Sequence, residues 1–172
     1  MTLTPSTATT EMRHDLKKVM LWIIAVALAA APLAAQTGTR GTKPTSPTEV
    51  ASAYLDAMDT AALDRAESLF AKESSIFEAG GEEGTWKHYR EHHIGPELAE
   101  FSSFKTTKGK PEEDVSADGS MAMVAWPIEY RIVLKDGKTA ESKGTVTFVL
   151  VREGDAYRIR HMHWSSRRSN PF

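Results

Sequence analysis

Turn signals at regular spacing in the second half of the chain constrain its fold more than any other feature. They stand at 118–119, 136–137 and 154–155 as Asp-Gly, Asp-Gly and Gly-Asp, pairs that favour tight turns between antiparallel strands. Apolar side chains alternate along 124–134 and again along 146–150, which predicts one buried face on each strand. We therefore expect an antiparallel meander. Pro127 has no N–H to donate to a neighbouring strand, so its strand should be bent, bulged or at an edge near that point.

Helices are predicted ahead of this sheet. Pro47 suits a first helical turn, and the apolar residues that follow it recur at helical spacing: Val50, Tyr54, Leu55 and Met58. A second helical stretch is expected over 60–70 and a short strand over 74–78. A third helix is expected over 85–100, interrupted at Gly95 and Pro96 so that it restarts at a new angle. This order predicts an α+β domain, with helices on one face of a strongly curved sheet.

The N-terminal segment has the pattern of a secretory signal. Three basic residues precede an apolar run over 19–31, which is short for a tilted membrane span. We expect cleavage near Ala35. The alternative is an uncleaved N-terminal anchor, and the protein would then contact a membrane through this segment alone. Residues 1–35 are then the signal, 36–46 a flexible linker, 47–168 the domain and 169–172 a tail. Either outcome predicts a secreted or periplasmic protein.

Composition excludes several classes of function. The chain has no cysteine, so disulfides, lipidation at cysteine, thiol catalysis and thiolate metal ligands are all ruled out. The formal net charge is −2, and acidic and basic residues are interspersed. Because phosphate backbones are bound by basic stripes, we do not expect a nucleic-acid partner.

Two stretches, 84–98 (GTWKHYREHHIGPEL) and 157–166 (YRIRHMHWSS), resemble the third helix and the last strand of bacterial SnoaL-like and DUF4440-type proteins. These belong to the nuclear transport factor 2-like (NTF2-like) superfamily, and the resemblance covers roughly 47–166. It implies a cone, or cystatin-like roll, in which a curved antiparallel sheet wraps around helices and encloses a cavity. In such families the cavity serves isomerases, cyclases, dehydratases and hydrolases, and also proteins that only bind a ligand. The acidic and phenolic residues of true ketosteroid isomerases are not matched, so that reaction is not inferred.

Histidines are the first candidates for chemistry. In an extended strand, alternate residues share a face, so His161 and His163 are expected to face the cavity with Tyr157, Ile159 and Ser165. The opposite face would carry the remaining residues Arg158, Arg160, Met162 and Trp164. His93, rather than its neighbour His92, would complete a three-histidine site for zinc or copper. The alternative is that these histidines form hydrogen bonds in a polar pocket without any metal or other cofactor.

Carboxylates and aromatic residues give the other candidates. Glu97 or Glu78 could act as a general base beside a histidine, but Glu97 could equally favour a helix dipole and Glu78 could simply be solvated. A flat or apolar ligand could contact five aromatic residues, of which we expect about two to touch it: Trp86, Tyr89, Trp126, Tyr130 and Tyr157.

Three functions remain open. The first choice is an exported domain that binds a small, largely apolar or aromatic molecule in the cone. The second is a metal-dependent or acid/base enzyme that uses the same cavity, with His93, His161, His163 and Glu97 as its catalytic residues. The third is a homodimeric interaction module, because the outer face of a curved sheet offers a dimer surface.

Overall fold

The computed structural model describes residues 45–169, and the predicted signal and most of the linker lie outside them. Helices and strands follow in this order: α1 (Pro47–Asp59), α2 (Leu63–Glu67), β1 (Phe70–Glu78), β2 (Gly81–Gly84), α3 (Trp86–Tyr89), the π-helix η2 (Arg90–Ile94), α4 (Gly95–Glu100), β3 (Phe101–Lys108), β4 (Glu112–Val115), β5 (Met121–Leu134), β6 (Thr139–Glu153) and β7 (Ala156–Arg168). None of the helices between residues 45 and 169 is both long enough and apolar enough to cross a membrane.

Helix α1 begins at a capping box. The Ser46 hydroxyl accepts from the backbone N–H of Glu49, and the Glu49 carboxylate accepts from the backbone N–H of Ser46. Pro47 occupies the first turn, where its missing N–H would have had no helical partner. The helix then buries the predicted stripe of Val50, Tyr54, Leu55 and Met58.

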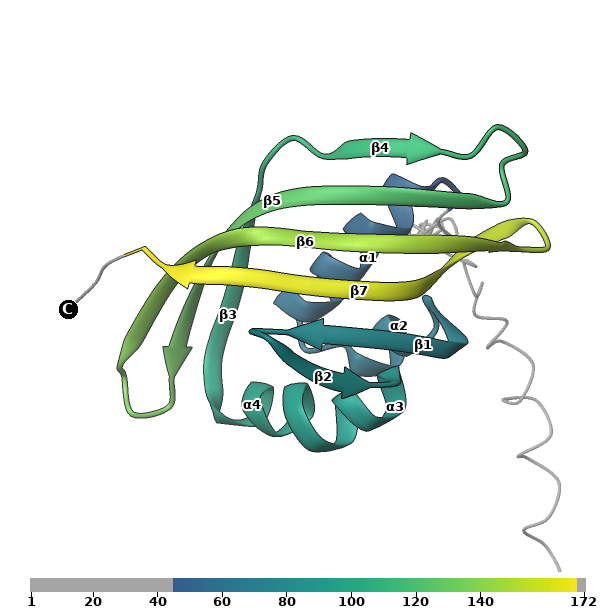
Figure 1. The fold of residues 1–172 in the computed structure, drawn as a ribbon. Helices are drawn as coiled ribbons and strands as arrows, with labels where there is room; N and C mark the ends of the chain where they lie inside the picture. The colour runs from purple at the N-terminus through teal and green to yellow at the C-terminus, as the bar shows by residue number, and fades with distance from the viewer. Residues whose placement is uncertain (1–44, 170–172) are drawn as a thin grey trace, which may run out of the picture. The chain divides into compact units, whose positions relative to one another are not determined.

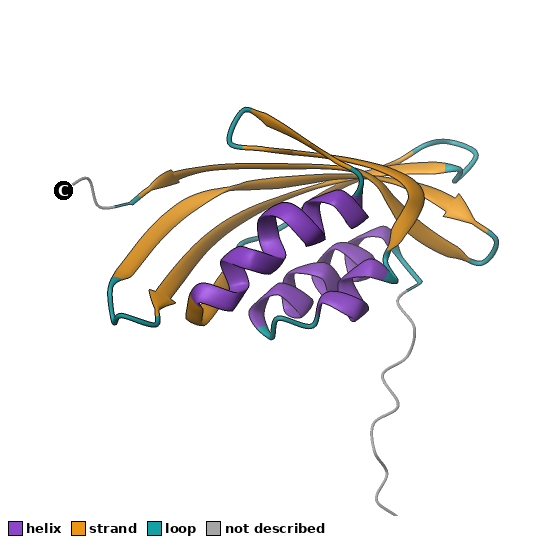
Figure 2. Cartoon of the chain, turned by 90° about the horizontal axis from the view of Figure 1, so that it is seen from below, coloured by secondary structure: helices purple, strands orange, loops and turns teal. Residues whose placement is uncertain are grey.

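One curved sheet of seven strands forms the other layer of this part of the chain. Its order is β2-β1-β7-β6-β5-β3, with β4 also paired to β5. Figure 1 shows the strands side by side, and Figure 2 shows the helices together on one side of the sheet. The predicted α+β class and cone-like arrangement are confirmed, with one difference. The first strand of the domain, β1, lies beside the last, β7, and pairs with it in parallel, unlike the antiparallel pairs of the rest of the sheet.

The three turn signals connect β4 to β5, β5 to β6 and β6 to β7, as predicted. The glycine of each has a positive φ, between 62° and 84°, a conformation that other residues rarely adopt. Pro127 lies in β5 at the point where its neighbour changes from β3 to β4. The Pro127 carbonyl accepts a hydrogen bond from the N–H of Gly109, which lies in the connection between β3 and β4. Proline has no N–H to donate, and it stands where β5 is paired with neither strand, so no ladder hydrogen bond is lost.

The core lies between α1 and the inner face of the sheet. The strands contribute Val124, Trp126 and Ile128 from β5 and Val146, Phe148 and Leu150 from β6, all buried. Tyr54 of α1 meets Phe70, Trp86 and Phe148 edge to face, with centroid distances of 5.6–6.1 Å. The alternation in the sequence therefore identified the buried face of β5 and β6 correctly.

The predicted face of β7 is wrong beyond Ile159. The pairing with β6 shifts there, because Leu150 pairs with Ile159 while the next residue, Val149, pairs with His161. Arg160 is thus the extra residue of a β-bulge, which reverses the alternation. Beyond it Met162 and Trp164 are buried, whereas His161 is half-buried and His163 exposed on the outer face.

Two predicted helices also differ. The second stops at Glu67, and Phe70 already begins β1. The third does not break at Gly95: the chain stays helical, and the Gly95 N–H bonds to the carbonyl of Arg90, five residues back. A Cβ at Gly95 would lie 2.3 Å from that carbonyl oxygen. Glycine therefore permits a π turn just before Pro96, where an ordinary helix would have ended.

Candidate functional site

A small cavity of about 60 Å³ lies between the helices and the inner face of the sheet. It is lined by Tyr54, Met58, Glu78, Tyr89, Ile94, Glu97, Phe101, Phe104, Tyr130, Ile132 and Trp164. These residues come from α1, β1, α3, η2, α4, β3, β5 and β7. A cavity lined from that many elements is assembled by the tertiary fold alone.

One wall of the cavity is aromatic. Phe104 lies 5.6 Å from Tyr130 and 6.4 Å from Trp164 between ring centroids, and Tyr130 and Trp164 meet edge to face at 5.6 Å. Phe101 stacks on Phe104 at 6.3 Å. The four rings form a continuous apolar surface that suits a methylated, alicyclic or aromatic group.

Glu78 at the end of β1 also lines the cavity, and it pairs with Trp164 in the register of β1 with β7. The Glu78 side chain is 20% exposed, and its Oε2 accepts a 2.5 Å hydrogen bond from the Tyr89 hydroxyl. Burial raises the pKa of the Glu78 carboxyl, while the Tyr89 bond and the nearby His93 act in the opposite direction. Burial also raises the pKa of Tyr89 well above its ordinary value. Glu78 is therefore a partly desolvated carboxyl that faces a cavity.

His93 connects three carboxylates beside the cavity. Its Nδ1 lies 2.9 Å from Glu83 of β2, and its Nε2 lies 3.3 Å from Glu97 and 3.9 Å from Glu78. Burial opposes the charged imidazolium, but the Glu83 hydrogen bond and the charges of Glu97 and Glu78 raise the pKa of His93 overall. The π turn that contains His93 places it on the same side as Glu97.

Two residues that line the cavity carry buried donors without a partner. The Tyr54 hydroxyl and the Trp164 indole N–H are fully enclosed, and neither has a hydrogen-bond partner among the described residues. Both residues line the cavity. A third such atom, Nε1 of Trp86, belongs to a core residue outside it. Because an unpaired buried donor is costly, an acceptor in the cavity would stabilise both groups.

The three predicted histidines do not meet. His93 lies beside the cavity, whereas His161 hydrogen-bonds through Nδ1 to the Ser75 hydroxyl at 2.8 Å and packs at a tilt against Phe77, a residue exposed on the outer face. His163 is on that outer face as well. Within residues 45–169 no three His, Asp or Glu side chains are arranged to hold a metal ion.

The predicted aromatic residues divide between the cavity and the core. Tyr89 and Tyr130 line the cavity. Trp86 stacks on Phe70 in the core, with ring centroids 4.7 Å apart. Trp126 donates to the Gly109 carbonyl, and Tyr157 donates to the Gly119 carbonyl at the far turn. The two predicted carboxylates, Glu78 and Glu97, both line the cavity.

Sequence reasoning missed Tyr54 and Trp164 as site residues. Tyr54 was assigned to the core stripe of α1, which it also joins, and Trp164 to the outer face of β7. No local signal distinguishes a core tyrosine from one that also lines a cavity. The bulge at Arg160 hid Trp164, because strict alternation places that residue on the wrong side.

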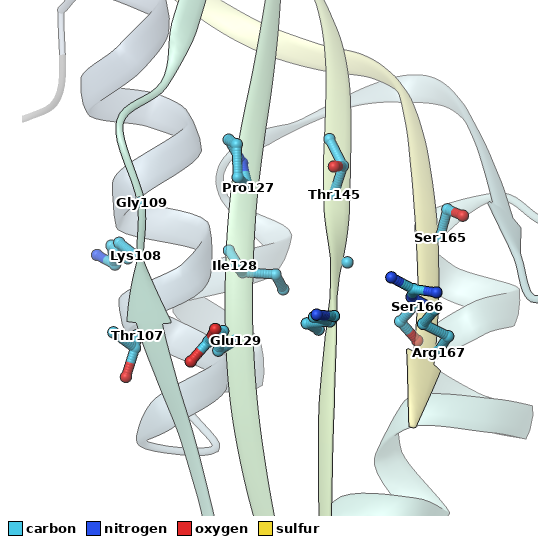
Figure 3. A pocket seen from close by; sticks show the side chains of 12 residues that line it. Thr107, Lys108, Gly109, Pro127, Ile128, Glu129, Thr145, Ser165, Ser166 and Arg167 are labelled. Atoms are coloured by element: carbon cyan, nitrogen blue, oxygen red, sulfur yellow. The ribbon is translucent and has the colours of Figure 1, made fainter. Parts of the chain in front are cut away.

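A wider hollow of about 680 Å³ lies on the outer face of the sheet, where β3, β5, β6 and β7 run side by side (Figure 3). Its charged side chains include Glu129, Lys143 and Arg167, in mixed sign, and hydroxyls of Thr145 and Ser165 lie beside them. In the strand register, Lys143 of β6 lies opposite Glu129 of β5 on one side and Arg167 of β7 on the other. The lining of this hollow includes none of the predicted site residues.

Solved structures share this arrangement. An NTF2-like superfamily protein from Salmonella enterica serovar Typhimurium LT2 is 26% identical, with a TM-score of 0.62 over 69% of this chain and 86% of that chain. A presumed ketosteroid isomerase from Shewanella frigidimarina NCIMB 400 is 22% identical, with a TM-score of 0.59 over 67% and 91%. A protein of unknown function with a cystatin-like fold from Nostoc punctiforme PCC 73102 is 12% identical, with a TM-score of 0.59 over 72% and 90%. The domain therefore has the NTF2-like fold.

The sequence itself matches the SnoaL-like domain family over residues 48–168. The chain belongs to that family. No protein with a curated description matches it significantly, so the function has to be argued from the site.

Proposed function

We propose that this domain binds a small, largely apolar or aromatic molecule that carries a hydrogen-bond acceptor, with the cavity between α1 and the sheet as its site. The observation that carries the proposal is a pair of unpartnered buried donors, the Tyr54 hydroxyl and the Trp164 indole N–H, on two residues that line one cavity of the described part of the chain. The ring surface of Phe104 and Tyr130 supports the apolar part of the ligand. This cavity is smaller than typical drug-sized sites, so the ligand is small or enters by displacing a side chain.

The proposal is tested by titrating the purified protein with small cyclic ketones and phenols, followed by heteronuclear NMR. Tyr54→Phe should weaken binding about tenfold, because the ligand's acceptor loses its donor. Tyr157→Phe is the matched control: its hydroxyl is bonded to Gly119 far from the cavity, so binding should not change. Equal affinity in both variants, or shifts confined to the outer face, would contradict the proposal.

A second candidate is acid/base catalysis in the same cavity, with Glu78 as the base. The raised pKa of its carboxyl and the two donors near it favour this function, because a developing oxyanion could be held while a proton moves to or from Glu78. His93 and Glu97 would then position and tune Glu78. Exchange of α-hydrogens of a bound ketone in D₂O, lost in Glu78→Gln with binding kept, would establish it.

We also propose export, as the N-terminal sequence predicts, with cleavage near Ala35. The segment lies outside the described residues. Expression of the full chain in a bacterial host, followed by fractionation and mass measurement of the product, tests this. A soluble periplasmic product that begins at Gln36 is expected, and a full-length product in the cytoplasm would refute export.

Dimerisation through the outer face of the sheet remains a third proposal. Met121, Met123 and Phe77 are exposed large apolar side chains, and their strands β5 and β1 belong to that sheet. Such a surface suits contact with a second copy. Sedimentation at high micromolar concentration should give a dimer that Met123→Glu disrupts; a monomer in the wild type would exclude it.

A further inference from the structure

We infer that the molecule bound in this cavity is a small organic cation, an alkylated ammonium that also carries an acceptor oxygen. The inference rests on the proposed function and names the class of its ligand. It is drawn from the excess of carboxylates at the cavity and from the aromatic surface that lines it.

Carboxylates outnumber cations at the cavity. Glu78 and Glu97 line it directly, and Glu83 adjoins it through His93. In the described part of the chain, the basic side chain that faces these three carboxylates is His93. Arg90, on the same helical segment, turns away to Asp64 and Glu67. At neutral pH these groups together are therefore negative even when His93 is protonated, and a cation would relieve the repulsion.

The aromatic lining determines which kind of cation fits. Phe104, Tyr130 and Trp164 present ring edges and faces within about 6 Å of one another. Aromatic surfaces attract alkylated ammonium groups, whose charge is spread over methyl groups and which lose little hydration on binding. A hydrated metal ion would instead need several oxygen or nitrogen ligands, and within residues 45–169 no three His, Asp or Glu side chains are placed to hold one.

The donors complete the ligand's description. The unpartnered donors of Tyr54 and Trp164 would bind an acceptor oxygen. The carboxylate of Glu78, the partner of Trp164 in the β1–β7 register, would bind a positive charge. A molecule with both groups a few bonds apart satisfies both requirements in one small cavity. The cavity of about 60 Å³ has the volume of only about two water molecules, so an alkylated ammonium enters by displacing a lining side chain.

A pair of isosteric probes separates charge from shape. Choline and 3,3-dimethylbutan-1-ol have the same outline and hydroxyl, but only choline is charged. Titration of the full-length purified protein by NMR or calorimetry should show choline binding at least tenfold more tightly. Equal binding of the two probes would overturn the inference and leave the proposed function intact. Binding of ketones or phenols with no binding of either probe would also overturn the inference alone. If none of these molecules binds, the proposed function fails as well.

Glu97→Gln tests the charge from the protein side. Glu97 is about half exposed at the cavity, so its replacement by the isosteric amide should not disturb folding. We expect choline affinity to fall about threefold to tenfold while the affinity for the neutral alcohol stays constant. Glu91→Gln is the matched control, because it replaces an exposed side chain of η2, and it should leave both affinities unchanged. An unchanged choline preference in Glu97→Gln would count against the inference.

Discussion

The Tyr89 hydroxyl donates to Oε2 of Glu78 over 2.5 Å, while Tyr54, which lines the same cavity, has a buried hydroxyl with no partner among the described residues. This contrast separates a tyrosine with a structural partner from the one to which the proposed function gives a ligand. Tyr89 stabilises the folded domain by solvating a buried carboxyl. In the proposed function, the free donor of Tyr54 bonds to the molecule that enters the cavity.

The first prediction follows from that contrast. Tyr89→Phe should lower the free energy of unfolding by about 1.5–3 kcal/mol, because a charged acceptor loses its bond. Tyr54→Phe should leave stability unchanged or raise it by up to about 1 kcal/mol, since an unsatisfied buried hydroxyl is removed. Urea denaturation at neutral pH measures both. Equal losses in the two variants would refute the distinction.

A second prediction concerns His93 and pH. Its pKa is raised in the folded state, so the folded protein binds the proton more tightly, and the resulting stability is complete below the unfolded pKa and lost as pH rises through the folded pKa. His93→Gln should therefore destabilise the domain at pH 5.5 by on the order of 1 kcal/mol, with the difference shrinking by pH 9. Denaturation at several pH values provides the measurement.

Removal of the partner should reproduce that effect. Glu83 makes the shortest contact with His93, at 2.9 Å, so Glu83→Gln should lower the His93 pKa and flatten the same part of the stability profile. NMR titration of the His93 ring protons reports the pKa directly. A His93 pKa that does not move in Glu83→Gln would show that the pair is not coupled as described.

The third prediction tests the bulge in β7. Met162 is fully buried beyond the bulge, whereas His163 next to it is exposed. Met162→Ala should cost about 2–5 kcal/mol of stability through the cavity it leaves, and His163→Ala should stay within about 0.5 kcal/mol. Thermal or urea unfolding compares them. A large loss on His163→Ala with a small one on Met162→Ala would mean that the strand faces are reversed.

The fourth prediction concerns the π turn. A methyl group at Gly95 would meet the Arg90 carbonyl oxygen at 2.3 Å, so Gly95→Ala should destabilise the domain by about 1–3 kcal/mol. The His93 ring resonances should shift too, because the turn sets its position against Glu97. Glu91→Ala, an exposed change in the same turn, is the control and should do neither. A tolerated Gly95→Ala would show that the π turn can relax.

Local patterns alone determined much of this protein. The spacing after Pro47 identified α1, the Asp-Gly and Gly-Asp pairs located the hairpins, and the alternation along β5 and β6 identified their buried face. Each of these signals acts between residues close in the chain, where backbone geometry leaves few choices. Glu78, Glu97, Tyr89 and Tyr130 were also recognised as candidates, because their residue types carry the relevant chemistry wherever they occur.

Only the tertiary structure decided which candidates share a cavity. One extra residue, Arg160, turned His161 and His163 outward and Trp164 inward, and a bulge of this kind depends on pairing with β6 and β1 rather than on local sequence. The parallel contact of β1 with β7 placed Glu78 beside Trp164, although the two residues are far apart in the sequence. Tyr54 became a site residue because the strands packed against α1 leave its hydroxyl without a partner in the described part of the chain. Long-range packing fixes all three relationships, and no short segment of the chain contains them.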